Sequence, residues 1–141
     1  MDTHTAEEHG AILERLRIMD EVEFAESELR NADTEFALFL GANIGDVHGV
    51  DDAAFAAFLR VHVTPVFPGF TVRTSVGFWN GEPETVRELV ILASGDALTA
   101  ARVATIARSY GGRFSQDSVL VTERPARVSF VSPVFRVGGG A

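Results

Sequence analysis

The sequence predicts an α+β domain of the ferredoxin-like class, with elements in the order βαββαβ. Between residues 34 and 131, strand-like and helix-like apolar periodicities follow one another in that order. Right-handed crossovers then place both helices on one face of an antiparallel sheet. Residues 36–40 and 89–92 are apolar at every position, which suits the two central strands of such a sheet.

The first half of the domain supplies a strand, a helix and a second strand. We expect the first strand over residues 34–40, followed by a loop rich in glycine. Asp51 is a good N-cap for a helix with apolar residues at helical spacing, and Pro65 ends that helix. Apolar and polar residues alternate over residues 70–78, which predicts a strand with one buried face.

The second half repeats the pattern. We expect a strand over residues 86–93 and a helix that is capped by Asp96 and ended by Gly111-Gly112. The last strand is expected over residues 118–122, with a break at a proline and a continuation over residues 127–131.

Two segments flank the domain of residues 34–131. Residues 1–33 carry ten acids and three arginines, so this arm holds most of the net charge of −8. Their pattern is consistent with a helix and equally with a frayed tail. Residues 132–141 form a glycine-rich tail.

The sheet has a second face that the two helices cannot cover. Because the central strands are apolar on both faces, we expect something else to bury this open face. The N-terminal helix could do so within one chain. A second copy of the chain is the preferred interpretation, which makes the protein a homo-oligomer.

Composition excludes several classes of function. The chain has no cysteine, its four histidines lack metal-ligand spacing, and all its basic residues are arginines, so we expect no metal, cofactor or lysine chemistry. No basic stripe is present for nucleic acid. No apolar run is long enough to span a membrane, and the acidic N-terminal segment is unlike a signal peptide, so we expect a cytoplasmic location.

The best candidate for a site residue is Glu88, a carboxylate at the start of an otherwise apolar strand. Such a group must be paired, hydrogen-bonded or in use. It either forms a salt bridge, with Arg73 or Arg124 as partner, or acts on a ligand. Trp79 is expected on the same face as Arg73, opposite Phe78, and serves either as an interface residue or as a wall for a cationic ligand.

A second group of polar residues precedes the last strand. Gln116, Asp117 and Ser118 follow the glycine stop of the second helix. They could hydrogen-bond a small polar ligand, or they could cap and turn the backbone. Tyr110, on the helix before them, is expected in the core with its hydroxyl group at the rim.

Across residues 34–131 the sequence resembles an uncharacterised bacterial domain family. The matching segments are Thr34-Glu35-Phe36, Val63 to Gly69, Gly77 with Trp79, Arg87-Glu88, and Tyr110 to Phe114 with Gln116 and Ser118 to Leu120. This resemblance implies no particular activity.

Residues 103–109 and 116–121 also resemble the phage S-adenosylmethionine lyases. That resemblance implies a ferredoxin-like trimer with sites between subunits, which splits S-adenosylmethionine into methylthioadenosine and homoserine lactone. It implies Glu88 as the catalytic carboxylate, and Trp79, Phe78, Arg73, Gln116 and Ser118 as substrate contacts, with Phe78-Trp79 in place of the family's tyrosine. The alternatives are a non-catalytic binding or assembly module that uses the open sheet face, and hydrolysis of a related metabolite by a water that Glu88 activates.

Overall fold

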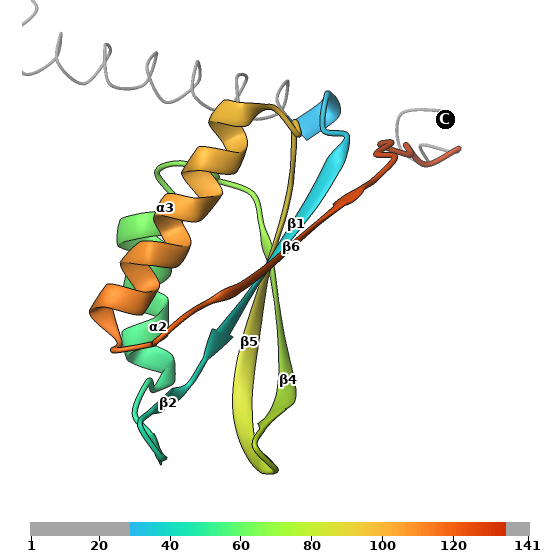
Figure 1. Ribbon diagram of the computed structural model, residues 1–141. Helices are drawn as coiled ribbons and strands as arrows, with labels where there is room; N and C mark the ends of the chain where they lie inside the picture. Colours follow the sequence, from blue (N-terminus) through green and yellow to red (C-terminus); the bar gives the residue numbers. More distant parts are fainter. Residues whose placement is uncertain (1–28, 135–141) are drawn as a thin grey trace, which may run out of the picture.

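A computed structural model describes residues 29–134 and confirms the ferredoxin-like class (Figure 1). Four antiparallel strands form one sheet in the order β4-β5-β1-β6. These strands are β1 (Thr34–Gly41), β4 (Thr71–Trp79), β5 (Glu82–Ala93) and β6 (Leu120–Pro125). The two all-apolar strands are central, as the sequence predicts. The expected N-terminal helix lies almost entirely outside the described residues.

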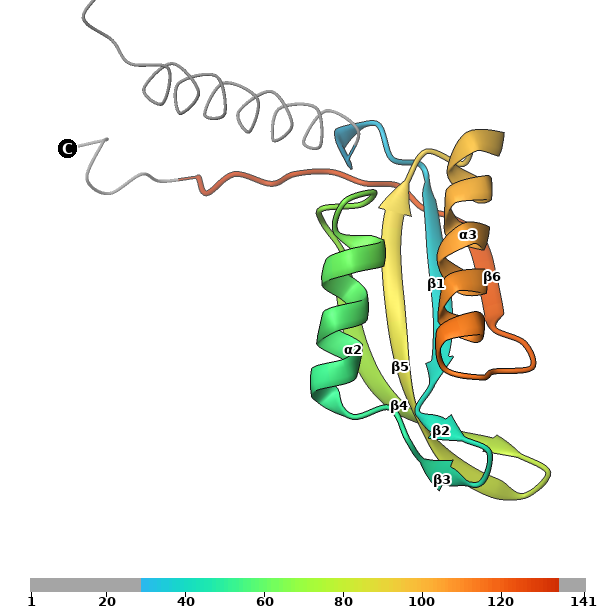
Figure 2. The same ribbon diagram turned by 90° about the vertical axis from the view of Figure 1, so that its left-hand side faces the viewer.

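The helices cover one face of this sheet, as Figures 1 and 2 show. They are α2 (Asp52–Phe58), which continues as a π-helical turn η1 (Leu59–Val63), and α3 (Ala97–Arg113). Both predicted caps are confirmed: an Asp51 carboxylate oxygen accepts from the Ala54 amide at 2.7 Å, and that of Asp96 accepts from the Thr99 amide at 2.8 Å. Each satisfies an amide that would otherwise lack a helical partner.

The core lies between the helices and the sheet. Its aromatic centre is Phe58 of α2, Tyr110 of α3 and Phe114, with the Phe58 and Tyr110 ring centroids 5.2 Å apart and edge to face. Aliphatic side chains from alternate positions of β1 and β5 complete it. This alternation fixes the orientation of the sheet, because Leu38 and Leu89 point at the helices and their neighbours point away.

Several predicted boundaries are wrong. Gly111-Gly112 lie inside α3, which ends at Arg113, and β5 begins at Glu82 rather than at Val86. The earlier start of β5 follows from the Asn80-Gly81 turn, since both residues have positive φ and close a two-residue hairpin directly onto β4. The glycine-rich loop after β1 contains a small ribbon of β2 (Asn43–Ile44) and β3 (Val47–His48).

The predicted continuation of the last strand over residues 127–131 is also wrong. β6 ends at Pro125, and Ala126 makes the last backbone hydrogen bond to the body, its amide donating to the Asp33 carbonyl at 2.9 Å. Beyond that point the neighbouring chain turns away into the helical residues 29–30, so no strand lies opposite residues 127–131. The segment is extended but unpaired.

Candidate functional site

The face of the sheet away from the helices carries the main polar candidates. Strand register and alternation place the following side chains on it: Glu35, Ala37, Phe39, Arg73, Ser75, Val86, Glu88, Val90, Leu120, Thr122 and Arg124. Most of these side chains are apolar or uncharged. Nothing among residues 29–134 covers this face in the way that α2 and α3 cover the other.

Glu88 and Arg73 form an ion pair at the middle of this open face. They are direct cross-strand partners, and the Arg73 Nη2 atom lies 3.7 Å from the Glu88 Oε1 atom. The Glu88 side chain is 18% exposed and that of Arg73 is 55% exposed. Arg124, the other partner considered from the sequence, pairs instead with Glu35 at 2.7 Å.

The surroundings of Glu88 limit its access to water on one side. Phe39 of β1 is its other cross-strand neighbour, and Val86 and Val90 flank it along β5 on the same face. The carboxylate therefore has an apolar surface on one side and a guanidinium on the other. Since a 3.7 Å contact is long for a charge-assisted hydrogen bond, both groups retain capacity to bind a ligand of opposite charge.

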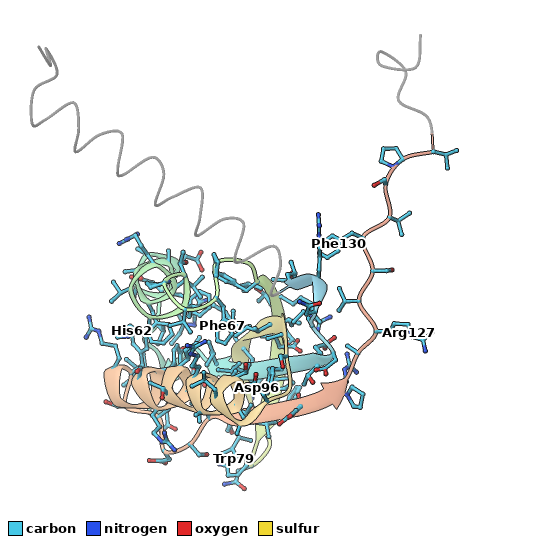
Figure 3. The ribbon with its side chains drawn as sticks, turned by 90° about the horizontal axis from the view of Figure 1, so that it is seen from above. His62, Phe67, Trp79, Asp96, Arg127 and Phe130 are labelled. Atoms are coloured by element: carbon cyan, nitrogen blue, oxygen red, sulfur yellow. The ribbon has the colours of Figure 1, made fainter. Side chains whose placement is uncertain are left out.

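Trp79 and Phe78 lie elsewhere, at the tip of the hairpin formed by β4 and β5. They are 78% and 72% exposed, and Figure 3 shows Trp79 projecting from the body. Trp79 shares the open face with Arg73 as expected, but it lies six positions further along β4, or about 20 Å away. Phe78 is on the helix-facing side, yet it lies beyond the reach of the helices and is not in the core.

Gln116 holds the backbone together at the end of β1. Its amide nitrogen donates to the carbonyl oxygens of Asn43, at 2.7 Å, and Phe114, at 3.0 Å. The Asn43 amide in turn donates to a carboxylate oxygen of Glu84 at 3.0 Å. Glu84 is therefore hydrogen-bonded to the backbone rather than simply solvated. These contacts match the capping interpretation of Gln116.

Ser118 and Asp117 line an open depression of about 430 Å³ between α3 and the start of β6. Apolar side chains of Ala104, Ala107, Val119 and Val121 also line it, together with Arg108 and Gln116. Within one chain the predicted site residues thus fall into three places: the Glu88 pair, the hairpin tip, and the end of α3.

Tyr110 is fully buried and connects α3 to the end of β1. Its hydroxyl group donates to the carbonyl oxygen of Gly41 at 2.5 Å. Burial, reinforced by the Glu84 carboxylate and opposed by the Arg87 guanidinium, raises the pKa of Tyr110 to about 12. The hydroxyl group lies inside rather than at the rim, so it is a structural proton donor.

Arg87 was not singled out from the sequence, although it is a buried cation. Its guanidinium donates to the Val50 carbonyl and to an Asp52 carboxylate oxygen, both at 2.9 Å, and lies over the Phe55 ring. It fastens β5 to the start of α2. The alternation of side chains along β5 could have predicted that Arg87 is buried, since residue 87 shares the helix-facing side with Leu89 and Ile91.

The described residues contain no cluster of histidine, aspartate and glutamate that could hold a metal ion. Nor is any helix within residues 29–134 long and apolar enough to cross a membrane.

The fold and its open face thus define a small ferredoxin-like domain with an ion pair on the uncovered side of its sheet. The chain belongs to the family described as "Protein of unknown function (DUF3574)", whose model matches residues 35–130. Comparison with curated proteins gives no match.

Two solved structures are similar in fold. One is a phage SAM lyase in complex with S-methyl-5'-thioadenosine, with a TM-score of 0.56 and 15% identity over 67% of this chain and 81% of that chain. The other is a phage SAM lyase in the apo state, with a TM-score of 0.56 and 14% identity over 74% of this chain and 93% of that chain. At such identities the likeness concerns the fold alone.

Proposed function

We propose that this protein cleaves S-adenosylmethionine to methylthioadenosine and homoserine lactone, as a homo-oligomer with its site on the open face. The observation that carries the proposal is the Glu88–Arg73 pair, on a fold similar to that of solved phage SAM lyases. S-adenosylmethionine carries a sulfonium cation and a carboxylate close together. An adjacent carboxylate and guanidinium offer the complementary charges.

The reaction needs no nucleophile from the protein. A carboxylate oxygen of the substrate forms a bond to its own γ-carbon, the bond between that carbon and sulfur breaks, and the electron pair goes to sulfur. The sulfonium becomes a neutral thioether, and no net proton is transferred. Holding the substrate in the ring-closing geometry accelerates such a step, because the entropy cost of orienting the reacting groups is met when the substrate binds.

Glu88 and Arg73 have distinct roles in this scheme. The Glu88 carboxylate faces the sulfonium and orients the departing sulfur. The Arg73 guanidinium, more exposed than its partner, holds the substrate carboxylate at the γ-carbon. Apolar neighbours such as Phe39 and Val86 lower the local dielectric and strengthen both contacts.

The remaining predicted contacts require a second copy. Because Trp79 is about 20 Å from the ion pair within one chain, we assign Trp79 and Phe78 to the site of a neighbouring subunit. There the indole ring would lie against the sulfonium or the adenine. We assign Gln116 and Ser118 to the rim of the same site in this arrangement. A trimer is the favoured assembly.

The experiment is incubation of the purified full chain with S-adenosylmethionine, followed by chromatography for methylthioadenosine and homoserine lactone. We expect both products in equal amounts, and a loss of at least about 100-fold in rate for Glu88→Gln, as for removal of other positioned electrostatic groups. Glu123→Gln is the matched control, because Glu123 is an exposed carboxylate on the opposite face of β6. It should retain full activity.

Other outcomes contradict the proposal. Absence of both products from a folded oligomer excludes the lyase activity. Activity that survives Glu88→Gln shows that the carboxylate has no part in it. Homoserine in place of its lactone at the earliest time points favours attack by water over ring closure.

A non-catalytic assembly module is the second candidate. The exposed aromatic tip, Phe78 and Trp79, favours it, because a tip of this kind suits a protein interface. This candidate predicts that Trp79→Ala dissociates the oligomer while S-adenosylmethionine shows no binding by calorimetry. The lyase proposal predicts measurable binding that weakens in the Arg73→Ala variant.

A further inference from the structure

The segment after β6 is extended and has no partner strand among the described residues. We name residues 126–132 the C-terminal arm. Figure 3 shows Arg127 and Phe130 on a stretch that leaves the body, and Figure 1 shows the same departure from the sheet. Its sequence, Ala-Arg-Val-Ser-Phe-Val-Ser, lies between Pro125 and Pro133. β-Branched and aromatic residues of this kind favour a strand.

The arm exposes apolar side chains that residues 29–134 do not bury. Phe130 is 57% exposed and Val131 is 90% exposed. Its ring lies loosely against Arg30, whose Cζ atom is 5.8 Å from the Phe130 ring centroid. An extended apolar segment with free backbone amides and carbonyls is suited to strand addition at the edge of another sheet.

The sheet itself offers a matching edge. β4 is at the end of the strand order, so its outer edge has no partner strand in the described part of the chain. It is nine residues long and contains neither proline nor lysine, the residues that commonly protect an edge. The arm of seven residues fits this length. The opposite edge strand, β6, is shorter and ends in Pro125.

The arm does not pair along the β4 edge of its own chain. It departs from β6, and both central strands, β5 and β1, lie between the two edges. Three strand spacings amount to about 14 Å across the sheet, a span that takes up about four of the seven residues and leaves too few to pair along β4. The edge that it can pair with therefore belongs to another copy.

Charge selects the direction of pairing. Arg127 is the single charged residue of the arm. An antiparallel arrangement brings Arg127 to the hairpin tip, next to Trp79 and its register partner Glu82, an exposed carboxylate. A parallel arrangement would instead bring Arg127 to the start of β4, near Arg73. The antiparallel case therefore brings Arg127 to an exposed carboxylate, whereas the parallel case brings it to Arg73, whose carboxylate neighbour Glu88 is already paired.

We propose that the C-terminal arm of one copy adds as an antiparallel strand to the β4 edge of a second copy. The contact joins two different surfaces, so repetition of it closes a ring when the rotation per subunit allows. It places Val131 beside Ser75 of the neighbour when Arg127 lies beside Trp79. This assembly does not depend on the proposed activity, and its test uses no substrate.

Cross-linking tests the contact directly, because the natural chain has no cysteine. Full-length Val131→Cys and Ser75→Cys proteins carrying tags of different size are mixed and treated with a short bismaleimide. The length of this cross-linker still allows reaction if the strand register is shifted by one residue pair. We expect a mixed dimer in at least about tenfold higher yield than from Val131→Cys with Glu123→Cys on the other edge strand. Equal yields from the two mixtures, or cross-linking of Val131→Cys chiefly to itself, overturn the proposal.

Sedimentation provides the second measurement. The double variant Ser129→Pro/Phe130→Pro removes two consecutive backbone amides. In a paired strand alternate amides point toward the partner, so one of the two must do so whichever set is paired. Neither residue is in the core. We expect its assembly to weaken by at least about tenfold, whereas the matched Val134→Pro control, beyond the arm, assembles normally. A natural chain that sediments as a monomer, or a double variant that assembles as well as the control, overturns the proposal.

Discussion

Replacement of Tyr110 by phenylalanine tests how α3 is held to the sheet. The substitution keeps the ring that packs edge to face on Phe58 and against Phe114. It removes only the hydroxyl group that donates to the Gly41 carbonyl at 2.5 Å. Because Tyr110 is fully buried, water does not replace the lost donor.

The expected cost at pH 7 is about 1–3 kcal/mol, the range for leaving a buried acceptor without its donor. For a domain of about 100 residues, this corresponds to a fall in Tm of roughly 4–8 °C per kcal/mol. The loss should be visible in urea titrations followed by far-UV circular dichroism. Trp79 fluorescence is a poor probe here, since the indole is already exposed in the folded state.

The pH dependence makes the test sharper. Burial raises the pKa of Tyr110 from 10.0 to about 12, so between these values the unfolded chain loses a proton that the folded chain keeps. Stability must then fall as pH rises, by up to about 3 kcal/mol for two pKa units. Phenylalanine has no such proton. The natural chain should therefore be the more stable at pH 7, and its advantage should shrink and then disappear between pH 10 and pH 12.

Two results would refute this reasoning. A Tyr110→Phe variant within about 0.3 kcal/mol of the natural chain at pH 7 would show that the hydroxyl group carries no net stabilisation. A stability difference that stays constant up to pH 12 would show that the Tyr110 phenol titrates alike in the folded and unfolded chains.

Two further predictions concern the helix starts. Arg87→Met should cost about 1–3 kcal/mol in urea unfolding, because it leaves the buried Val50 carbonyl without a donor, whereas Asp52→Asn should cost less than about 1 kcal/mol, since that carboxylate is exposed. Equal losses would contradict this assignment. Asp96→Ala should lower the Tm at pH 7. The Thr99 amide holds the pKa of Asp96 below 3.8, so the contribution is present above that pH and lost below it, and the two Tm values should converge in acid.

The sequence carried much of the information about individual elements. Asp51 and Asp96 mark the helix starts because capping is a local interaction between a side chain and an amide three residues away. The all-apolar runs of β1 and β5 identify the central strands because burial on two faces leaves no polar position. The end of α3 was misjudged at Gly111-Gly112, since tertiary packing of Tyr110 and Phe114 overrides the weak helix propensity of glycine there.

In the candidate site, too, local features could be predicted from the sequence and contacts between distant residues could not. Glu88 could be singled out from the sequence because a carboxylate in an apolar strand conflicts with its surroundings. Its partner could not be chosen between Arg73 and Arg124, since cross-strand register depends on the turn that joins the strands. The separation of Trp79 from Glu88 was equally hidden. Both lie on one face, and only the direction and length of β4 place one at the tip and the other at the middle.

What the sequence by itself determined is therefore local: the βαββαβ order, the helix caps, the apolar central strands and the exceptional carboxylate. Each depends on residues within a few positions of one another. What the tertiary structure decided is which distant residues meet. It paired Glu88 with Arg73, buried Arg87 against Val50, directed Gln116 to Asn43, and left residues 127–131 without a strand opposite them. The physical reason is that register, twist and helix docking are properties of the whole sheet, which no short stretch of sequence encodes alone.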